Sequence, residues 1–384
     1  MEMATSYLYR KGALRLENVL EKYGISDMIE SVDGKRRIIL NQVNCDLYNY
    51  LSVESRYSPL FKGSYLTNYC WGYTSLGELM ADNQFHSIIG ENYMSTIILQ
   101  NKKLQVTINT HGAEVISVIN QKTKKEYMWC GDSKYWGRVS PVLFPFVGKV
   151  NEWKYRHNGI EYNNIPQHGF ARDSEFEVRQ QTSTSAFFSL IKDATWDEKY
   201  PFEFELGIGY ELWDDTLKVR WKVINTGKDS LHFSIGAHPA FSCERGLSEY
   251  KLNFHTEKNL LACGIVDENG LLSDTIVTKP LENGELALSD EIFEDDALVL
   301  DGTDFNCVTL SSRDNQPILQ VEFHTPQLGI WSPPKKHAPF VCIEPWYGRC
   351  DRNTFTGTLE EREFSNHLLP EENFEKEYQI KFFV

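Results

Sequence analysis

The sequence predicts a large antiparallel β-sandwich over residues 91–384, preceded by a small segment rich in α-helix over residues 1–90. Apolar and polar residues alternate in Leu217–Val223 and again in Tyr378–Phe382, which is the pattern of strands with one buried face. Three Asn-Gly pairs indicate tight hairpin turns: Asn158-Gly159, Asn269-Gly270 and Asn283-Gly284. Many short strands separated by turns indicate a sandwich or barrel.

The first ninety residues carry the pattern of helices with one hairpin. Apolar residues recur every three or four positions over residues 6–24, where Gly24 is placed to end the helix. Asp33-Gly34 predicts a hairpin between residues 28–30 and 36–40. Aromatic-rich helices are expected at residues 45–52 and 58–81. In the long part, further strands are expected at residues 95–100, 104–108, 186–191 and 203–212.

Composition excludes several classes of function. With 39 basic and 54 acidic residues the net charge is -15, which argues against binding nucleic acid along the whole chain. No run of about 20 apolar residues predicts a membrane span, and no signal peptide is evident. The scattered cysteines favour reduced thiols and a cytoplasmic location. No phosphate loop or Cys/His metal spacing appears, so neither a cofactor nor a metal is expected.

Three short stretches place a titratable residue among small or rigid neighbours. They are residues 166–172 with His168, residues 235–241 with His238, and residues 341–348 with Glu344. A carboxylate that ends an apolar run is costly to bury unless it has a partner or a task, and burial would raise its pKa toward that of a general base. Each histidine could donate a proton to an oxygen. The alternatives are a Glu paired with an Arg and core imidazoles bonded to carbonyl groups.

Six tryptophans in the β-rich part could either pack in the core or offer a flat surface to a sugar ring. Most of the six are expected in the core, because a large sandwich needs bulky side chains. Trp331 and Trp346 are the two assigned to substrate binding. The six are Trp129, Trp136, Trp153, Trp196, Trp331 and Trp346.

Together with residues 140–149, the three stretches resemble the aldose 1-epimerase (galactose mutarotase-like) superfamily, most closely its LacX-type branch. Four motifs in the order of that family extend the resemblance over about residues 93–384. The resemblance implies a large antiparallel β-supersandwich and interconversion of the α and β anomers of an aldose without a cofactor. It implies that His238 donates a proton to the ring oxygen, that Glu344 removes the proton of the C1 hydroxyl, and that His168 binds the sugar.

The chain departs from the family pattern at two sugar-binding positions. An arginine that touches the sugar in many mutarotases has Lys149 or Arg138 as its candidate here. A sugar-binding aspartate has no clear match, and Asp296 and Asp301 are the candidates. A phosphosugar would require several arginines, and those near the motifs are Arg138, Arg172 and Arg349.

Residues 1–90 resemble the helical segment that follows the winged-helix part of some bacterial response regulators. Residues 6–24 would be the recognition helix and residues 28–40 the wing. The helices that normally support a recognition helix have no counterpart, so a cap or a self-association segment is expected instead of DNA binding.

The sequence leaves three functions open: a free-aldose epimerase, an epimerase of a phosphosugar or oligosaccharide, and a non-catalytic sugar sensor. A sugar is the expected partner, and a homo-oligomer is possible.

Overall fold

The computed structural model describes residues 29–32, 35–38 and 96–384 except residue 193. The chain divides into two units, Met1–Ser95 and Thr96–Val384. In the first unit, β1 (Ile29–Val32) pairs with β2 (Lys35–Ile38) in antiparallel register, which confirms the hairpin predicted around Asp33-Gly34. The helices expected at 6–24, 45–52 and 58–81 lie outside the described residues, as do most residues of the winged-helix resemblance.

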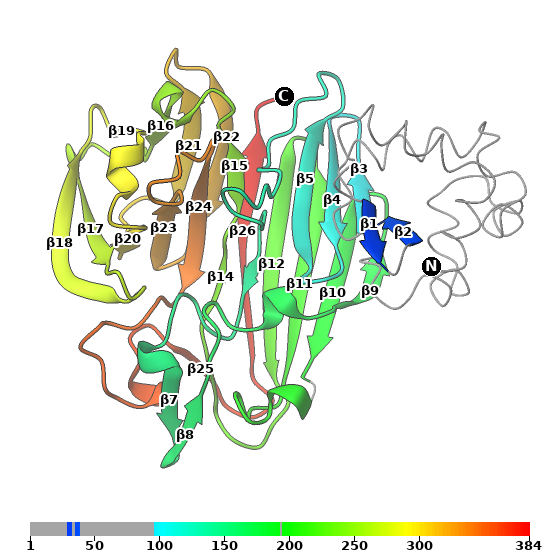
Figure 1. The fold of residues 1–384 in the computed structure, drawn as a ribbon, viewed down its shortest axis with the longest axis vertical. Helices are drawn as coiled ribbons and strands as arrows, with labels where there is room; N and C mark the ends of the chain where they lie inside the picture. The colour runs from blue at the N-terminus through cyan, green and yellow to red at the C-terminus, as the bar shows by residue number, and fades with distance from the viewer. Residues whose placement is uncertain (1–28, 33–34, 39–95, 193) are drawn as a thin grey trace, which may run out of the picture. The chain divides into compact units, whose positions relative to one another are not determined.

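The second unit is built on two large antiparallel sheets (Figure 1). The nine-stranded sheet has the order β19-β16-β21-β22-β26-β12-β11-β10-β9. Its strands are β9 (Glu177–Gln181), β10 (Ser185–Ile191), β11 (Phe204–Trp213), β12 (Thr216–Asn225), β16 (Tyr250–Asn253), β19 (Glu285–Ala287), β21 (Cys307–Ser312), β22 (Pro317–Phe323) and β26 (Asn373–Phe382).

The eight-stranded sheet has the order β18-β17-β20-β23-β24-β14-β6, and β15 pairs with β24 beside this path. Its strands are β6 (Val142–Leu143), β14 (Ile235–Ala237), β15 (Ala240–Ser242), β17 (Leu260–Val266), β18 (Leu272–Pro280), β20 (Leu298–Asp301), β23 (Gln327–Trp331) and β24 (Phe340–Tyr347). Strand β24 lies inside this sheet, with β23 on one side and β14 and β15 on the other.

Smaller sheets complete the unit. They are formed by β3 (Thr96–Gln100), β4 (Leu104–Asn109) and β5 (Glu114–Asn120), by β7 (Lys154–His157) and β8 (Ile160–Asn163), and by β13 (Leu231–Phe233) and β25 (Asn366–Leu368). Helical structure in the described residues is limited to 3-10 turns of three or four residues. The antiparallel β-sandwich predicted from the sequence is therefore confirmed. No helix in this part of the chain has the length and hydropathy needed to cross a membrane.

The alternation of apolar and polar residues that predicted strands matches the alternation of buried and more exposed side chains in the structure. In β12 the side chains of Leu217, Val219, Trp221 and Val223 are buried, whereas that of Arg220 is exposed. Alternate side chains point to opposite faces of a strand, so one face joins the core and the other meets solvent.

Two of the Asn-Gly pairs form the expected left-handed turns. Asn158 and Gly159 have φ of 49° and 76° and connect β7 to β8. Asn283 and Gly284 have φ of 53° and 78°. In the third pair only Gly270 has a positive φ, of 77°, in the connection from β17 to β18.

The two large sheets meet face to face across the main hydrophobic core. Trp221 of β12 contacts Tyr347 of β24 edge to face, with ring centroids 6.2 Å apart. Val341 and Ile343 of β24 belong to this core and are fully buried. The intervening residues of β24 therefore point to the opposite face of the sheet, where the motif residues gather.

Candidate active site

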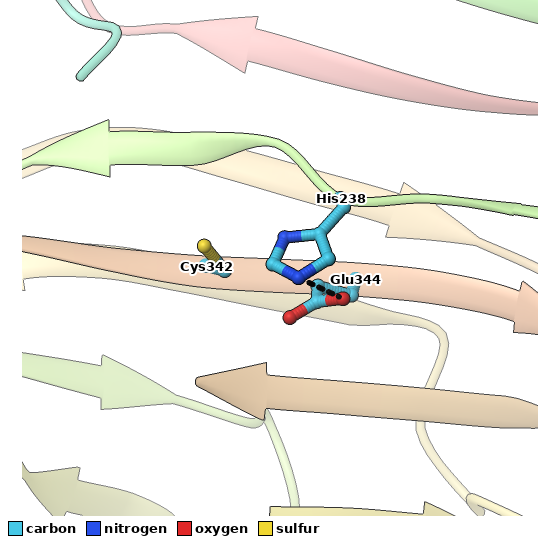
Figure 2. Close-up of side chains that lie close together, drawn as sticks. All are labelled: His238, Cys342 and Glu344. Atoms are coloured by element: carbon cyan, nitrogen blue, oxygen red, sulfur yellow. Dashed lines mark ion pairs between the residues drawn. The ribbon is translucent and has the colours of Figure 1, made fainter. Parts of the chain in front are cut away.

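Strand β24 presents Cys342, Glu344 and Trp346 on one face, because these residues alternate with core residues. Gly236 of β14 pairs with Trp346, so His238, two residues further along an antiparallel neighbour, comes opposite Glu344. Figure 2 shows the His238 ring over the Glu344 carboxylate, with Cys342 on the same strand. The Nε2 atom of His238 lies 3.4 Å from Oε2 of Glu344. Two motifs that are distant in the sequence thus meet in one pair.

Burial shifts the pKa values of His238 and Glu344 in opposite directions. Glu344 is 1% exposed, and its Oε2 has no hydrogen-bond partner. Burial raises the pKa of Glu344 well above its ordinary value, and the charge of Asp296 adds to the rise. Burial lowers the pKa of His238 to about 3, with smaller contributions from the charges of Arg172 and Arg138. A neutral imidazole beside a protonated carboxyl group is therefore the favoured state of the empty pair.

His168 is held as a neutral hydrogen-bond donor. Its Nδ1 accepts a hydrogen bond from the backbone N–H of Gly148 at 3.1 Å, so the proton of the neutral ring lies on Nε2. Burial lowers the pKa of His168 well below its usual value, and the charge of Arg172 acts in the same direction. The ring stands edge-on to that of His238, with centroids 5.5 Å apart. An uncharged N–H donor beside the His238–Glu344 pair could donate a hydrogen bond to an oxygen of a neutral ligand.

Two tryptophans enclose His238. Trp136 stacks on the imidazole with ring centroids 4.7 Å apart, and Trp331 meets it edge-on at 5.3 Å. The Nε1–H of Trp331 donates to Oδ1 of Asp296 at 2.6 Å. Both indoles are only partly buried. The sequence assigned Trp331 to the substrate but gave Trp136 no role, because only the folded chain brings it beside His238.

Two guanidinium groups lie near the histidines. Nη2 of Arg138 donates to Oδ1 of Asp173 at 2.7 Å, while Nε of Arg172 is 3.6 Å from the other oxygen of that carboxylate. The Nε atom of Arg172 is buried without a hydrogen-bond partner. Burial, and then the charge of Arg138, lowers the pKa of Arg172 to about 10. One carboxylate thus faces two cations.

Lys149 and Asp301 have their contacts elsewhere. The ammonium of Lys149 donates to the carbonyl oxygen of Asn269 at 2.6 Å and lies 4.1 Å from the ring centroid of Trp153. Asp301 accepts from Nε of the buried Arg349 at 3.0 and 3.2 Å. Of the two aspartates considered from the sequence, Asp296 is the one that acts on Glu344.

Trp346 lies against the sheet beside Glu344. A Cβ at Gly329 would fall 2.3 Å from two atoms of its indole, and a Cβ at Gly236 would fall 2.5 Å from a third. Both glycines lie on strands that flank β24: Gly329 of β23 pairs with Glu344, and Gly236 of β14 pairs with Trp346 itself. The missing side chains make room for the ring, which is only 6% exposed.

We expect Gly329→Ala to displace the Trp346 indole and slow any reaction at Glu344. Overpacking of this kind costs about 1–3 kcal/mol of stability, and a displacement of about 1 Å near a reacting group lowers rates by up to about 100-fold. Thermal unfolding and sugar turnover would be measured together. Gly209→Ala is the matched strand control, since its Cβ would meet its nearest neighbour at an ordinary 3.4 Å. Equal behaviour of the two variants would contradict the expectation.

One buried cluster also contains metal-ligating atoms. Ligand atoms of His238, Cys342 and Glu344 all lie within 4.8 Å of one another. Sequence spacing gave no sign of this cluster, because His238, in the connection between β14 and β15, is farther from Cys342 and Glu344 in the chain than short metal motifs allow.

Comparison with known proteins identifies the family. The sequence profile of the aldose 1-epimerase family matches residues 95–381. Protein LacX (chromosomal) of Lactococcus lactis subsp. lactis is 33% identical over 296 residues, which cover 74% of this chain and 98% of LacX.

Solved structures agree with this assignment. A galactose mutarotase related enzyme from Lactobacillus acidophilus is 33% identical with a TM-score of 0.71, covering 76% of this chain and 98% of that one. A galactose mutarotase-like protein from Lactobacillus casei is 28% identical with a TM-score of 0.71, covering 75% and 100%. The matched residues 95–381 include both large sheets and the segments that carry His238 and Glu344. The chain belongs to the aldose 1-epimerase family over residues 95–381.

Proposed function

We propose that this protein is an aldose 1-epimerase that interconverts the α and β anomers of a free aldose. His238 is the general acid and Glu344 the general base. The observation that carries the proposal is the 3.4 Å approach of these two buried groups, whose pKa values are shifted in opposite directions. Groups with pKa values pushed apart by their environment are typical of acid–base catalysis.

Ring opening requires two proton transfers on one hemiacetal. Protonated His238 gives its Nε2 proton to the ring oxygen, while ionised Glu344 takes the proton of the C1 hydroxyl. The bond between C1 and the ring oxygen breaks and leaves an open-chain aldehyde. Rotation about the C1–C2 bond and reversal of both transfers close the ring on the other face. One proton remains on the pair in total, so each turnover ends as it began.

Burial favours the protonation state that follows ring opening. After both transfers His238 is neutral and Glu344 is protonated, which is the state that desolvation stabilises. The site thus lowers the free energy of the open-chain intermediate relative to the ion pair that precedes it. The Nε2–H of His168 supplies a further donor for a sugar oxygen, since its Nδ1 is bound to Gly148.

The surroundings of the pair suit an uncharged sugar. The rings of Trp136 and Trp331 offer apolar surfaces to the C–H faces of a pyranose. We expect Asp296, which accepts a hydrogen bond from the indole N–H of Trp331, to accept another from a sugar hydroxyl.

Polarimetry tests the proposal directly. Pure α-D-glucose or α-D-galactose would be dissolved with and without the protein, and the approach to the same final rotation would be timed. A faster approach is expected with at least one aldose. Saturable sugar binding without any acceleration would overturn the proposal and favour a sugar sensor.

A phosphosugar is the second candidate, favoured by the guanidinium groups of Arg138 and Arg172. Their two positive charges face the single carboxylate of Asp173, and a phosphate would supply further negative charge. Comparing free and 6-phosphorylated hexoses separates the two substrates. A preference for the phosphosugar that disappears in Arg172→Gln would support this second candidate.

The pH dependence of kcat/KM follows from the shared proton. Activity requires one proton on the pair, so it falls on the acid side when a second proton binds His238, whose pKa is lowered to about 3. It falls on the alkaline side when Glu344, whose pKa is raised, loses the remaining proton. We expect a constant kcat/KM through the mildly acidic range, after subtraction of spontaneous mutarotation. An acid limb centred near the ordinary histidine pKa of about 6.5 would contradict this assignment.

A further inference from the structure

The proposed mechanism uses two residues of the buried cluster, His238 and Glu344, but not the third, Cys342. Cys342 lies on the same face of β24 as Glu344, two residues away, and its side chain is fully buried. We propose that His238, Cys342 and Glu344 form a binding site for one thiophilic divalent cation of the zinc type, and that the bound ion blocks the acid–base pair.

The spacing of the donor atoms is close to that of a tetrahedral zinc site. Zinc bonds of about 2.0 Å to nitrogen or oxygen and about 2.3 Å to sulfur place neighbouring ligand atoms about 3.3–3.6 Å apart. Nε2 of His238 and Oε2 of Glu344 are already 3.4 Å apart. All three ligand atoms lie within 4.8 Å of one another, so a small movement of the thiol completes the set.

An unpartnered polar atom points to a ligand at this position. The Oε2 of Glu344 is buried and accepts no hydrogen bond. Buried polar atoms without partners are rare, and each calls for an explanation such as a water or an ion. The same oxygen is the one that faces His238.

Charge balance favours a divalent cation over a monovalent one. The ion replaces two protons, that of the Cys342 thiol and that of the protonated Glu344 carboxyl group, and both protons leave to solvent. A thiolate and a carboxylate then neutralise the two positive charges, so the buried complex carries no net charge. The positive charge of Arg172, which acts on His238, opposes binding of a cation, whereas the carboxylate of Asp296, which acts on Glu344, supports it. Sulfur, imidazole and carboxylate together select zinc, cadmium or cobalt over magnesium and calcium.

Binding has a consequence for the proposed epimerase. The ion takes Nε2 of His238 and Oε2 of Glu344, the two atoms that exchange protons with the sugar. It therefore competes with sugar for the pair. This inhibitory effect depends on the proposed function, but binding of the ion does not.

Cobalt spectroscopy tests the site without reference to activity. The full chain, reduced and freed of metal with a chelator, would be titrated with Co²⁺ and then with Zn²⁺. We expect one Co²⁺ per chain with a thiolate-to-cobalt charge-transfer band, displaced by Zn²⁺. Cys342→Ser should remove the band and weaken binding at least about 10-fold, and Glu344→Gln should weaken it similarly.

Two other cysteines provide controls. Cys243 is a buried thiol next to Cys342, and Cys130 is an exposed thiol. Cys243→Ser and Cys130→Ser should keep the band. A spectrum without a thiolate band, or a band that survives in Cys342→Ser and in Glu344→Gln, overturns the proposal.

The activity measurement separates the two proposals. Zn²⁺ should inhibit mutarotation competitively with sugar, and Cys342→Ser should keep the basal rate but lose the inhibition. Thiolate-dependent Co²⁺ binding without turnover of any aldose would retain the metal site and refute the epimerase. Turnover of an aldose without thiolate-dependent Co²⁺ binding would support the epimerase and refute the metal site.

Discussion

Glu344→Gln should lower the rate of mutarotation by about 100- to 10,000-fold, the usual contribution of a positioned general base. Glutamine has almost the same volume as glutamate but cannot take the C1 hydroxyl proton. The change also removes a carboxyl group that is costly to bury, so the free energy of unfolding should not fall. Polarimetry at saturating sugar gives kcat, and circular dichroism with thermal unfolding reports the fold.

A glutamate outside the site provides the control for this variant. The carboxylate of Glu205 on β11 accepts a hydrogen bond from the Ser189 hydroxyl at 2.7 Å and belongs to the nine-stranded sheet, whereas Glu344 belongs to the eight-stranded one. Glu205→Gln should keep the rate of the unchanged protein. If Glu344→Gln kept it as well, Glu344 would not be the base.

Gly169→Ala should destabilise the protein by more than about 3 kcal/mol and abolish activity. Gly169 has a φ of 68°, a conformation that alanine adopts only with strain. Its Cβ would lie 2.2 Å from the carbonyl oxygen of Phe144, which already accepts the N–H groups of Phe170 and Ala171. Relief of this clash must move the loop that holds His168. Denaturant unfolding and mutarotation would both be measured.

Gly159 separates the backbone strain from the clash. It has a φ of 76°, but a Cβ there would meet nothing within 4 Å. Gly159→Ala should therefore cost only about 1 kcal/mol, the strain of a positive φ alone. Equal destabilisation by the two substitutions would show that the contact with Phe144 has no effect.

Local patterns predicted the strands well where one face is buried. The alternation of Leu217 with Lys218 and of Tyr378 with Gln379 records a boundary between core and solvent, so β12 and β26 could be found from the sequence. Strand β24 has no such alternation, because both its faces are covered by protein. It was recognised through its motif instead.

The candidate site could be selected from the sequence only as far as its motifs extend. His168, His238 and Glu344 could be selected because each stands among small or rigid neighbours. The stacking of Trp136 on His238 and the bond from Gly148 that fixes the His168 tautomer join segments that are distant in the chain. Such contacts leave no periodic signal, and the same holds for Cys342.

The candidate site combines a strand that is part of the core, β24, with loops around it, and we expect the two parts to tolerate substitution differently. Glu344 alternates with the core residues Ile343 and Val341 on one hydrogen-bonded strand, so a backbone shift that moves Glu344 also disturbs the core. By contrast, Trp136, Arg172 and Asp296 lie outside the strands, as does His238, which directly follows β14. Under the proposed function, we expect substitutions at Trp136, Arg172 or Asp296 to alter the shape and charge around a bound sugar while Glu344 keeps its place on β24. Relatives with different sugar preferences are therefore expected to differ in these loops while keeping the chemistry of β24.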